Sequence, residues 1–162
     1  MLLPWPTLRR ADKAHPVPTL QHLLRAHGHV VTVDGEFGPR TDGAVRVFQQ
    51  RMHLTSDGVV GPRTWRAIVV EVRAGALGEA VRGVQEEFCF RAGDPRGGLP
   101  VDGEFGPRTD AAVRSWQRTI RDGDDAAMPV DGVAGPLTWQ SLVSGMYVGC
   151  PPVSSPGRRP FR

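Results

Sequence analysis

The stretch Asp34-Gly-Glu-Phe-Gly-Pro-Arg-Thr-Asp-Gly-Ala-Val-Arg46 returns 68 residues later as Asp102-Gly-Glu-Phe-Gly-Pro-Arg-Thr-Asp-Ala-Ala-Val-Arg114, with one change in thirteen positions. Chance does not produce such a match, so the chain contains an internal repeat. Matches upstream and downstream occur at offsets of 64 and 74, which places insertions of four and six residues in the second copy, within 89–101 and 118–130. Both insertions are polar and rich in turn-forming residues, and we predict surface loops there.

A shorter unit, Asp-Gly-x-x-Gly-Pro-x-Thr, occurs four times, starting at Asp34, Asp57, Asp102 and Asp131. Asp-Gly favours a tight turn, and the proline suits the first position of a helix, where its missing N–H is not needed. Apolar residues follow each unit at helical spacing, and one further helix is expected near 17–27 and another near 80–90.

The sequence therefore predicts an all-α fold of two tandem three-helix repeats, at 8–72 and 73–143. A short N-terminal extension (1–7) and a flexible C-terminal tail rich in Pro and Arg (144–162) complete the predicted organisation. A repeat of this size is marginal for independent stability, so we expect the two repeats to pack against each other.

Composition excludes several classes of function. The formal net charge of the chain is only +3, and the basic residues do not gather in one block, so we predict no nucleic-acid partner. No apolar stretch approaches the roughly 20 residues of a membrane span, and we predict no membrane partner. The apolar start of the sequence is too short and too interrupted by proline for the apolar region of a signal peptide, so we predict no signal peptide and assign no export route.

The repeated residues resemble the peptidoglycan-binding domain family, a three-helix module found on bacterial and phage cell-wall hydrolases. In the first copy the family pattern is matched at Val17, Leu20, Gln21, Leu24, Gly28, Asp34 to Gly38, Thr41, Ala44, Val45, Phe48, Gln49, Asp57 to Pro62 and Trp65. In the second copy it is matched at Val81, Gln85, Asp102 to Gly106, Thr109, Ala112, Val113, Gln117, Asp131, Gly132, Gly135, Pro136 and Trp139.

One departure concerns the turn before the first helix of each repeat. The family often carries two glycines there, as the second copy does at Gly75 and Gly78, whereas the first copy has Ala11 and Ala14. If these positions need positive φ, the first copy must be strained or differently built.

The resemblance implies non-catalytic binding to bacterial peptidoglycan, with the protein anchoring itself or a partner at the cell wall, outside the cell. It implies neither enzymatic activity nor a cofactor. We expect a shallow groove in which polar side chains bind the polymer. The candidates are Asp34, Glu36, Arg40 and Thr41 in the first repeat and Asp102, Glu104, Arg108 and Thr109 in the second.

Structural roles compete with these functional ones. The favoured interpretation of Asp34 and Asp102 is a turn residue that accepts backbone N–H groups. Phe37, Phe105, Trp65 and Trp139 are expected in the core. Trp5 lies outside the repeats, and two interpretations remain open for it: it covers an exposed face, or it meets a partner.

No metal site is predicted. His27 and His29, with His22 or His53, could supply zinc ligands, but the second copy contains no histidine. The acidic run 122–125 lacks the spacing of a calcium loop. Whether Cys89 and Cys150 pair is left open.

A competing hypothesis makes the chain a structural component of a phage or phage-tail-like particle, with the fold used for protein interaction and the virion or particle as its location. In either case a cell-wall hydrolase or a particle protein is a candidate partner, through the Trp5 segment or the C-terminal tail.

Overall fold

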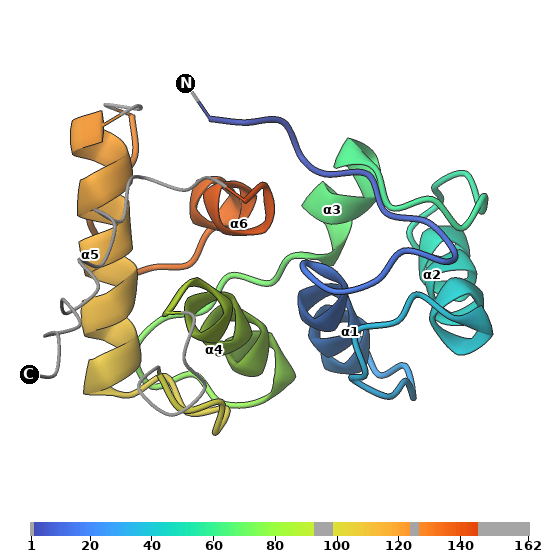
Figure 1. Cartoon of the computed structure of the whole chain (residues 1–162), viewed down its shortest axis with the longest axis horizontal. Helices are drawn as coiled ribbons and strands as arrows, with labels where there is room; N and C mark the ends of the chain where they lie inside the picture. The colour runs from blue at the N-terminus through green and yellow to red at the C-terminus, as the bar shows by residue number, and fades with distance from the viewer. Residues whose placement is uncertain (1, 93–98, 124–126, 146–162) are drawn as a thin grey trace, which may run out of the picture.

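The computed structural model describes residues 2–92, 99–123 and 127–145, and within them the chain is helical with no β-strand. The elements are α1 (Val17–Ala26), α2 (Pro39–Arg51), α3 (Pro62–Ile68), α4 (Glu79–Ala92), α5 (Pro107–Gly123) and α6 (Pro136–Val143). Helices α1 to α3 form the first repeat and α4 to α6 the second, and α1 faces α4 at the centre of the molecule (Figure 1). The predicted all-α fold with two three-helix repeats is confirmed.

Helices α2, α3, α5 and α6 all begin at the proline of the repeated unit, as predicted. The glycine before the proline is extended where the cap geometry is defined, with ψ of −173° at Gly38, −170° at Gly61 and −174° at Gly135. An extended residue followed by a proline with helical φ starts a helix without losing any backbone hydrogen bond. The helix ends are less well predicted: α3 ends at Ile68, and Val72 instead pairs its backbone with Ala134.

A buried tryptophan lies at the same place in each repeat. Trp65 and Trp139 are both 0% exposed, which confirms their predicted core role. Each indole N–H donates to a backbone carbonyl of the segment preceding its repeat, Pro6 for Trp65 and Val70 for Trp139, at 2.8 Å in both cases. In each repeat an equivalent hydrogen bond thus ties the core tryptophan to the segment that precedes the repeat.

Trp5 packs against the core tryptophan of the first repeat. Its ring stacks on that of Trp65, with centroids 6.0 Å apart and planes at 15°, and only 6% of the residue is exposed. Of the two interpretations left open by the sequence, burial supports the one in which Trp5 covers the first repeat. Residue 5 therefore packs as part of the core, although the sequence places it in an extension.

The turn before α1 has positive φ at the same two positions as the turn before α4, despite the missing glycines. Ala11 and Ala14 have φ of 81° and 63°, where Gly75 and Gly78 have 89° and 109°. The amide of Ala11 donates to the carbonyl of Phe37, just as Gly75 donates to Phe105. The first copy therefore keeps positive φ at both positions and accepts a backbone strain of about 1–2 kcal/mol at each alanine.

The contact between the repeats is close and polar. Glu87 on α4 is completely buried, and it accepts a hydrogen bond from Thr19 on α1 (2.6 Å) and lies 2.7 Å from His15 Nε2. Glu79 is the first residue of α4, and its carboxylate lies 2.8 Å from His22 Nδ1 and 3.2 Å from the Arg25 guanidinium. Histidines of the first repeat thus contact glutamates of the second.

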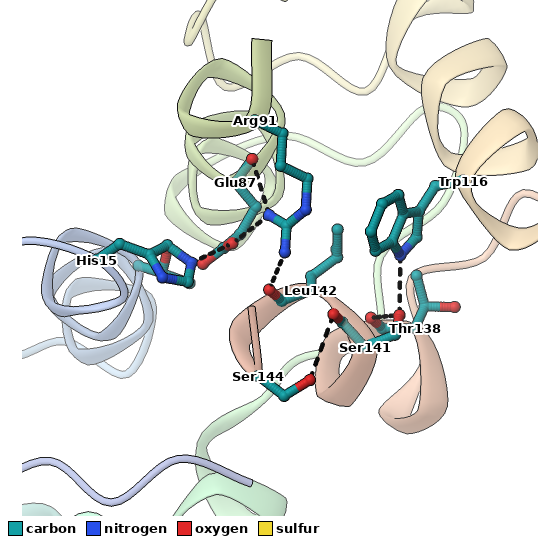
Figure 2. A network of polar contacts seen from close by, with 9 residues as sticks. His15, Glu87, Arg91, Trp116, Thr138, Ser141, Leu142 and Ser144 are labelled. Atoms are coloured by element: carbon teal, nitrogen blue, oxygen red, sulfur yellow. Dashed lines mark hydrogen bonds and ion pairs between the residues drawn. The ribbon is translucent and has the colours of Figure 1, made fainter. Parts of the chain in front are cut away.

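Figure 2 shows how this polar contact continues into the second repeat. Arg91 donates to the Glu87 carboxylate (2.7 Å) and to the carbonyl of Leu142 on α6, and its guanidinium lies 4.7 Å from the centre of the Trp116 ring. A buried carboxylate without such partners would be strongly destabilising. The network therefore connects α1, α4, α5 and α6.

The predicted loops of the second copy are partly helical: the inserted segments expected as loops begin at Arg91 and Arg121, yet α4 runs to Ala92 and α5 to Gly123. Helix α5 has 17 residues against 13 in α2, and α4 has 14 against 10 in α1. Ile120 on the added turn of α5 is fully buried and packs with Met128, Trp116 and Leu2. This extra apolar cluster stabilises the longer helix.

Residues 93–98, 124–126 and 146–162, and with them most of the predicted tail and Cys150, lie outside the described residues.

Substitution of Gly83 tests the packing between repeats. A Cβ at this position of α4 would lie 3.2 Å from Trp139 Cη2 and 3.6 Å from His22 Cβ, so Gly83→Leu should destabilise the protein by about 1–3 kcal/mol. Gly43→Leu on α2 is the matched control, because a Cβ there meets no atom within 4 Å. Chemical denaturation of both variants measures the difference, and equal stability would contradict the described packing.

Candidate functional site

A buried glutamine amide organises each Asp-Gly turn. In the first turn, Gln21 Nε2 lies 2.7 Å from Asp34 Oδ1, 3.0 Å from the carbonyl of Glu36 and 3.2 Å from Thr41 Oγ1. Its Oε1 accepts the backbone N–H of Gly35 at 3.0 Å. The side chain is 0% exposed, so these contacts replace all of its bonds to water.

We call this arrangement the glutamine clamp, and it occurs four times. Each clamp joins a glutamine, the aspartate and glycine of the repeated unit, and its threonine. The glycine has φ between 73° and 79° in every case, which a residue with a side chain rarely adopts. The members are Gln21–Asp34–Gly35–Thr41, Gln49–Asp57–Gly58–Thr64, Gln85–Asp102–Gly103–Thr109 and Gln117–Asp131–Gly132–Thr138.

The aspartates act as turn residues, which confirms the structural interpretation of Asp34 and Asp102. Asp34 Oδ1 accepts the backbone N–H of Glu36 at 2.9 Å, and Asp102 Oδ1 accepts that of Glu104 at the same distance. These backbone hydrogen bonds, followed by those from the clamp glutamines, hold the pKa of both carboxyls below the usual aspartate value.

The eight predicted site residues lie around two equivalent hollows, four in each. The hollow of the first repeat has a volume of about 380 Å³ and that of the second about 210 Å³. The first is lined by Thr32, Asp34, Glu36, Gly38, Pro39, Arg40 and Thr41, and the second by Leu99, Pro100, Asp102, Glu104, Gly106, Pro107, Arg108 and Thr109.

The lining residues differ in what they can offer a ligand. Thr41 and Thr109 are 3% and 2% exposed and are engaged by the clamps. Arg40 and Arg108 are exposed and form no hydrogen bond or ion pair within the described part of the chain. The guanidinium of each hollow is therefore its free donor, and the glutamate beside it is an acceptor.

The two hollows are not identical. Glu36 forms an ion pair with Lys13 at 2.9 Å, while the matching position in the second repeat is Leu77, which is 76% exposed beside Glu104. Glu104 forms no ion pair with the described residues. The second hollow thus has an unpaired carboxylate next to an exposed apolar side chain.

Other groups considered from the sequence have structural contacts. His22 lies against Glu79, and His27 Nε2 lies 2.9 Å from the carbonyl of Ile68. Cys89 contacts the carbonyl of Leu99, and burial raises the pKa of its thiol.

Within the described ranges, no group of three or more His, Cys, Asp or Glu side chains is placed to hold a metal ion. No helix among those ranges is long and apolar enough to span a bilayer.

Sequence reasoning assigned no role to the clamp glutamines, although it matched all four to the family pattern. The available signal was a polar residue at a fixed place on an otherwise apolar helical face, repeated four times. The candidate site residues were also chosen only from the first Asp-Gly unit of each repeat. The unit that starts at Asp57 was therefore omitted.

The model of the putative peptidoglycan binding domain matches this chain twice, at residues 14–68 and 78–142. The chain belongs to this family. The two matches coincide with the two helical repeats, and each contains two glutamine clamps.

Two curated relatives of this peptidoglycan-binding family member are named as enzymes. The N-acetylmuramoyl-L-alanine amidase CwlM of Mycobacterium tuberculosis is 34% identical over 121 residues, which is 65% of this chain and 27% of the amidase. The zinc D-Ala-D-Ala carboxypeptidase of Streptomyces albus G is 36% identical over 96 residues, 58% of this chain and 33% of the carboxypeptidase. The chain thus spans about a third or less of either relative.

Among solved structures, a peptidoglycan-binding protein from Clostridioides difficile in complex with glutamine hydroxamate matches with 33% identity and a TM-score of 0.39. The match covers 39% of this chain and 40% of that one. The Burkholderia AP3 phage endolysin matches with 24% identity and a TM-score of 0.39, over 69% of this chain and 38% of the endolysin.

The lowered pKa values of Asp34 and Asp102 predict a specific loss of stability in acid. A carboxyl whose folded pKa lies below its unfolded pKa stabilises the fold fully above the unfolded value and loses that contribution as the pH falls through the folded value. The melting temperature should therefore fall below about pH 4. Asp34→Asn/Asp102→Asn should be less stable at neutral pH and lose less on acidification.

Thermal unfolding between pH 7 and pH 2 measures this effect. Glu71→Gln is the control, because Glu71 is exposed and bonds to no described residue. If the asparagine variant and the wild type lost stability in parallel, the two turn carboxylates would not be responsible.

Proposed function

We propose that this chain binds bacterial cell-wall peptidoglycan without cleaving it, and so holds itself or a partner at the wall. The observation that carries the proposal is the pair of equivalent hollows, each with a free arginine and a glutamate over a glutamine clamp, in two repeats of a peptidoglycan-binding family.

The chemistry of the hollows suits this polymer. Peptidoglycan presents acetamido groups, hydroxyls and peptide carboxylates. An arginine fork donates to carbonyl and carboxylate oxygens, and a glutamate accepts from amide N–H and hydroxyl groups. Arg40 with Glu36, and Arg108 with Glu104, supply both kinds of group in one hollow.

Two sites on one rigid molecule favour a repetitive ligand. The polar contact between α1 and α4 holds the repeats together, so the two hollows keep a constant separation. A polymer can occupy both at once, and the second contact then forms at a high effective concentration. Weak individual sites are sufficient for retention on the wall.

The proposal that binding occurs without cleavage rests on what the hollows offer. The threonines are engaged by the clamps, and the aspartates are bound to the turn, so the remaining groups serve recognition. The relatives named as hydrolytic enzymes are much longer than the matched segment. A separate cell-wall hydrolase is the partner that this interpretation favours, and the outside of the cell is the location.

The alternative is a component of a phage or phage-tail-like particle. One observation that favoured it, an accessible Trp5, does not hold. Trp5, which the sequence offered as a contact for a partner, is buried against Trp65. The peptidoglycan proposal takes precedence because both repeats match the peptidoglycan-binding family.

Co-sedimentation with insoluble peptidoglycan stripped of teichoic acid tests the proposal. The wild type should pellet at low and high salt and release no muropeptides. Arg40→Ala/Arg108→Ala should weaken binding about tenfold or more, since each change removes charge-assisted hydrogen bonds.

Arg118→Ala controls for the loss of a surface arginine, because Arg118 is exposed on α5 and lines neither hollow. Release of muropeptides would overturn the non-catalytic proposal. Equal pelleting of the double variant and the control would show that the two hollows are not the binding sites.

A further inference from the structure

A third hollow lies in the first repeat, at the clamp formed by Gln49 and Asp57. Its volume is about 550 Å³, which is larger than either hollow described above. Its lining includes Leu54, Asp57, Val59, Pro62, Arg63 and Arg66.

Two arginines of this hollow are free of partners. Arg63 and Arg66 lie three residues apart on α3, so they share one face of the helix. Both are exposed, and neither forms an ion pair or hydrogen bond within the described part of the chain. By contrast, Arg46 is held by Asp42 at 3.1 Å. The two guanidiniums thus line the hollow without an ion pair to any described residue.

The carboxylate that lines this hollow has one oxygen engaged in the clamp. It belongs to Asp57, whose Oδ1 accepts from Gln49 (3.1 Å) and from the backbone N–H of Val59 (2.9 Å). No ion pair joins it to Arg63 or Arg66 among the described contacts. An anion entering the hollow would therefore meet two available forks.

Part of the remaining lining is apolar, and it lies beside the polar side chains of His53, Thr55 and Thr64. Leu54, Val59 and Pro62 present aliphatic surface beside the arginines. Such a surface accommodates a short aliphatic group, such as a methyl, next to the bound anion.

The second repeat lacks this combination. The positions that match Arg63 and Arg66 are Leu137 and Gln140, and Gln140 donates to the carbonyl of Leu3 at 2.8 Å. The position that matches Leu54 is Met128, which is 2% exposed, with its sulfur 3.8 Å from Thr138 Oγ1. The cationic hollow is therefore a feature of one repeat.

We infer that the Arg63–Arg66 hollow binds the terminal carboxylate of a short peptide with a small aliphatic side chain. This inference rests on the proposed function in one respect, since it takes the peptide part of peptidoglycan as the natural source of that group. Paired arginine forks bind a planar carboxylate through parallel N–H···O bonds, and the apolar lining then contacts the side chain.

Amide NMR of the full chain tests the inference. The probes are N-acetyl-alanyl-alanine, the same dipeptide with its carboxylate converted to an amide, and inorganic phosphate. The free dipeptide should shift the amide signals of residues 57–66, and the amidated form should bind at least tenfold more weakly, because it lacks the charge. Phosphate should shift them less than the dipeptide, since it leaves the aliphatic surface uncovered.

Arg63→Ala/Arg66→Ala should abolish these shifts, while Arg118→Ala should leave them unchanged. Arg63→Lys/Arg66→Lys keeps the charge and the aliphatic stems, so it should fold normally and bind more weakly than the wild type. No shift with the wild type, equal binding of both dipeptides, a stronger response to phosphate, or full affinity in the lysine variant would each overturn the inference.

Co-sedimentation separates this inference from the proposed function. A chain that pellets with the wall but does not respond to the dipeptide refutes the inference alone. A chain that responds to the dipeptide but stays in the supernatant refutes the proposed function and leaves the carboxylate site standing.

Discussion

The glutamine clamp is the interaction on which the rest of the structure depends. A buried amide that donates to an aspartate, a carbonyl and a threonine, and accepts from a glycine N–H, is stable only if every partner is present. Loss of any partner leaves a buried polar group unsatisfied, which costs about 1–3 kcal/mol. This requirement explains why Asp, Gly and Thr recur together four times. It also places a helix start and a surface hollow beside the same turn.

The contact between repeats gives a second constraint. Histidines occur only in the first half of the sequence, and two of them, His15 and His22, lie against Glu87 and Glu79 of the second repeat. The repeats are thus similar in fold but different in their contact surfaces. One side carries the histidines and the other the glutamates, which favours pairing of a first repeat with a second repeat over pairing of two like repeats. A constant separation of the hollows follows from this contact.

Much of the fold could be predicted from the sequence. The four proline starts, the buried Trp65 and Trp139 and the two three-helix repeats all follow from local rules and periodicity. The burial of Trp5 could not be predicted, because it depends on a long-range contact with Trp65. The longer α5 depends on the packing of Ile120 with Met128, which no local pattern reveals. The eight candidate residues predicted from the sequence line two hollows, but only the coordinates show that Arg63 and Arg66 line a third.

The clamp can be tested most directly by comparing two neighbouring glutamines of α2. Gln49 is buried in a clamp, whereas Gln50 is exposed and its side chain bonds to no described residue. Gln49→Glu replaces the donating amide with a carboxylate that faces Asp57, so it should lower the free energy of unfolding by about 2 kcal/mol or more. Gln50→Glu should change it by less than about 0.5 kcal/mol. Equal stability of the two variants by urea denaturation would contradict the claim that the clamps hold the fold together.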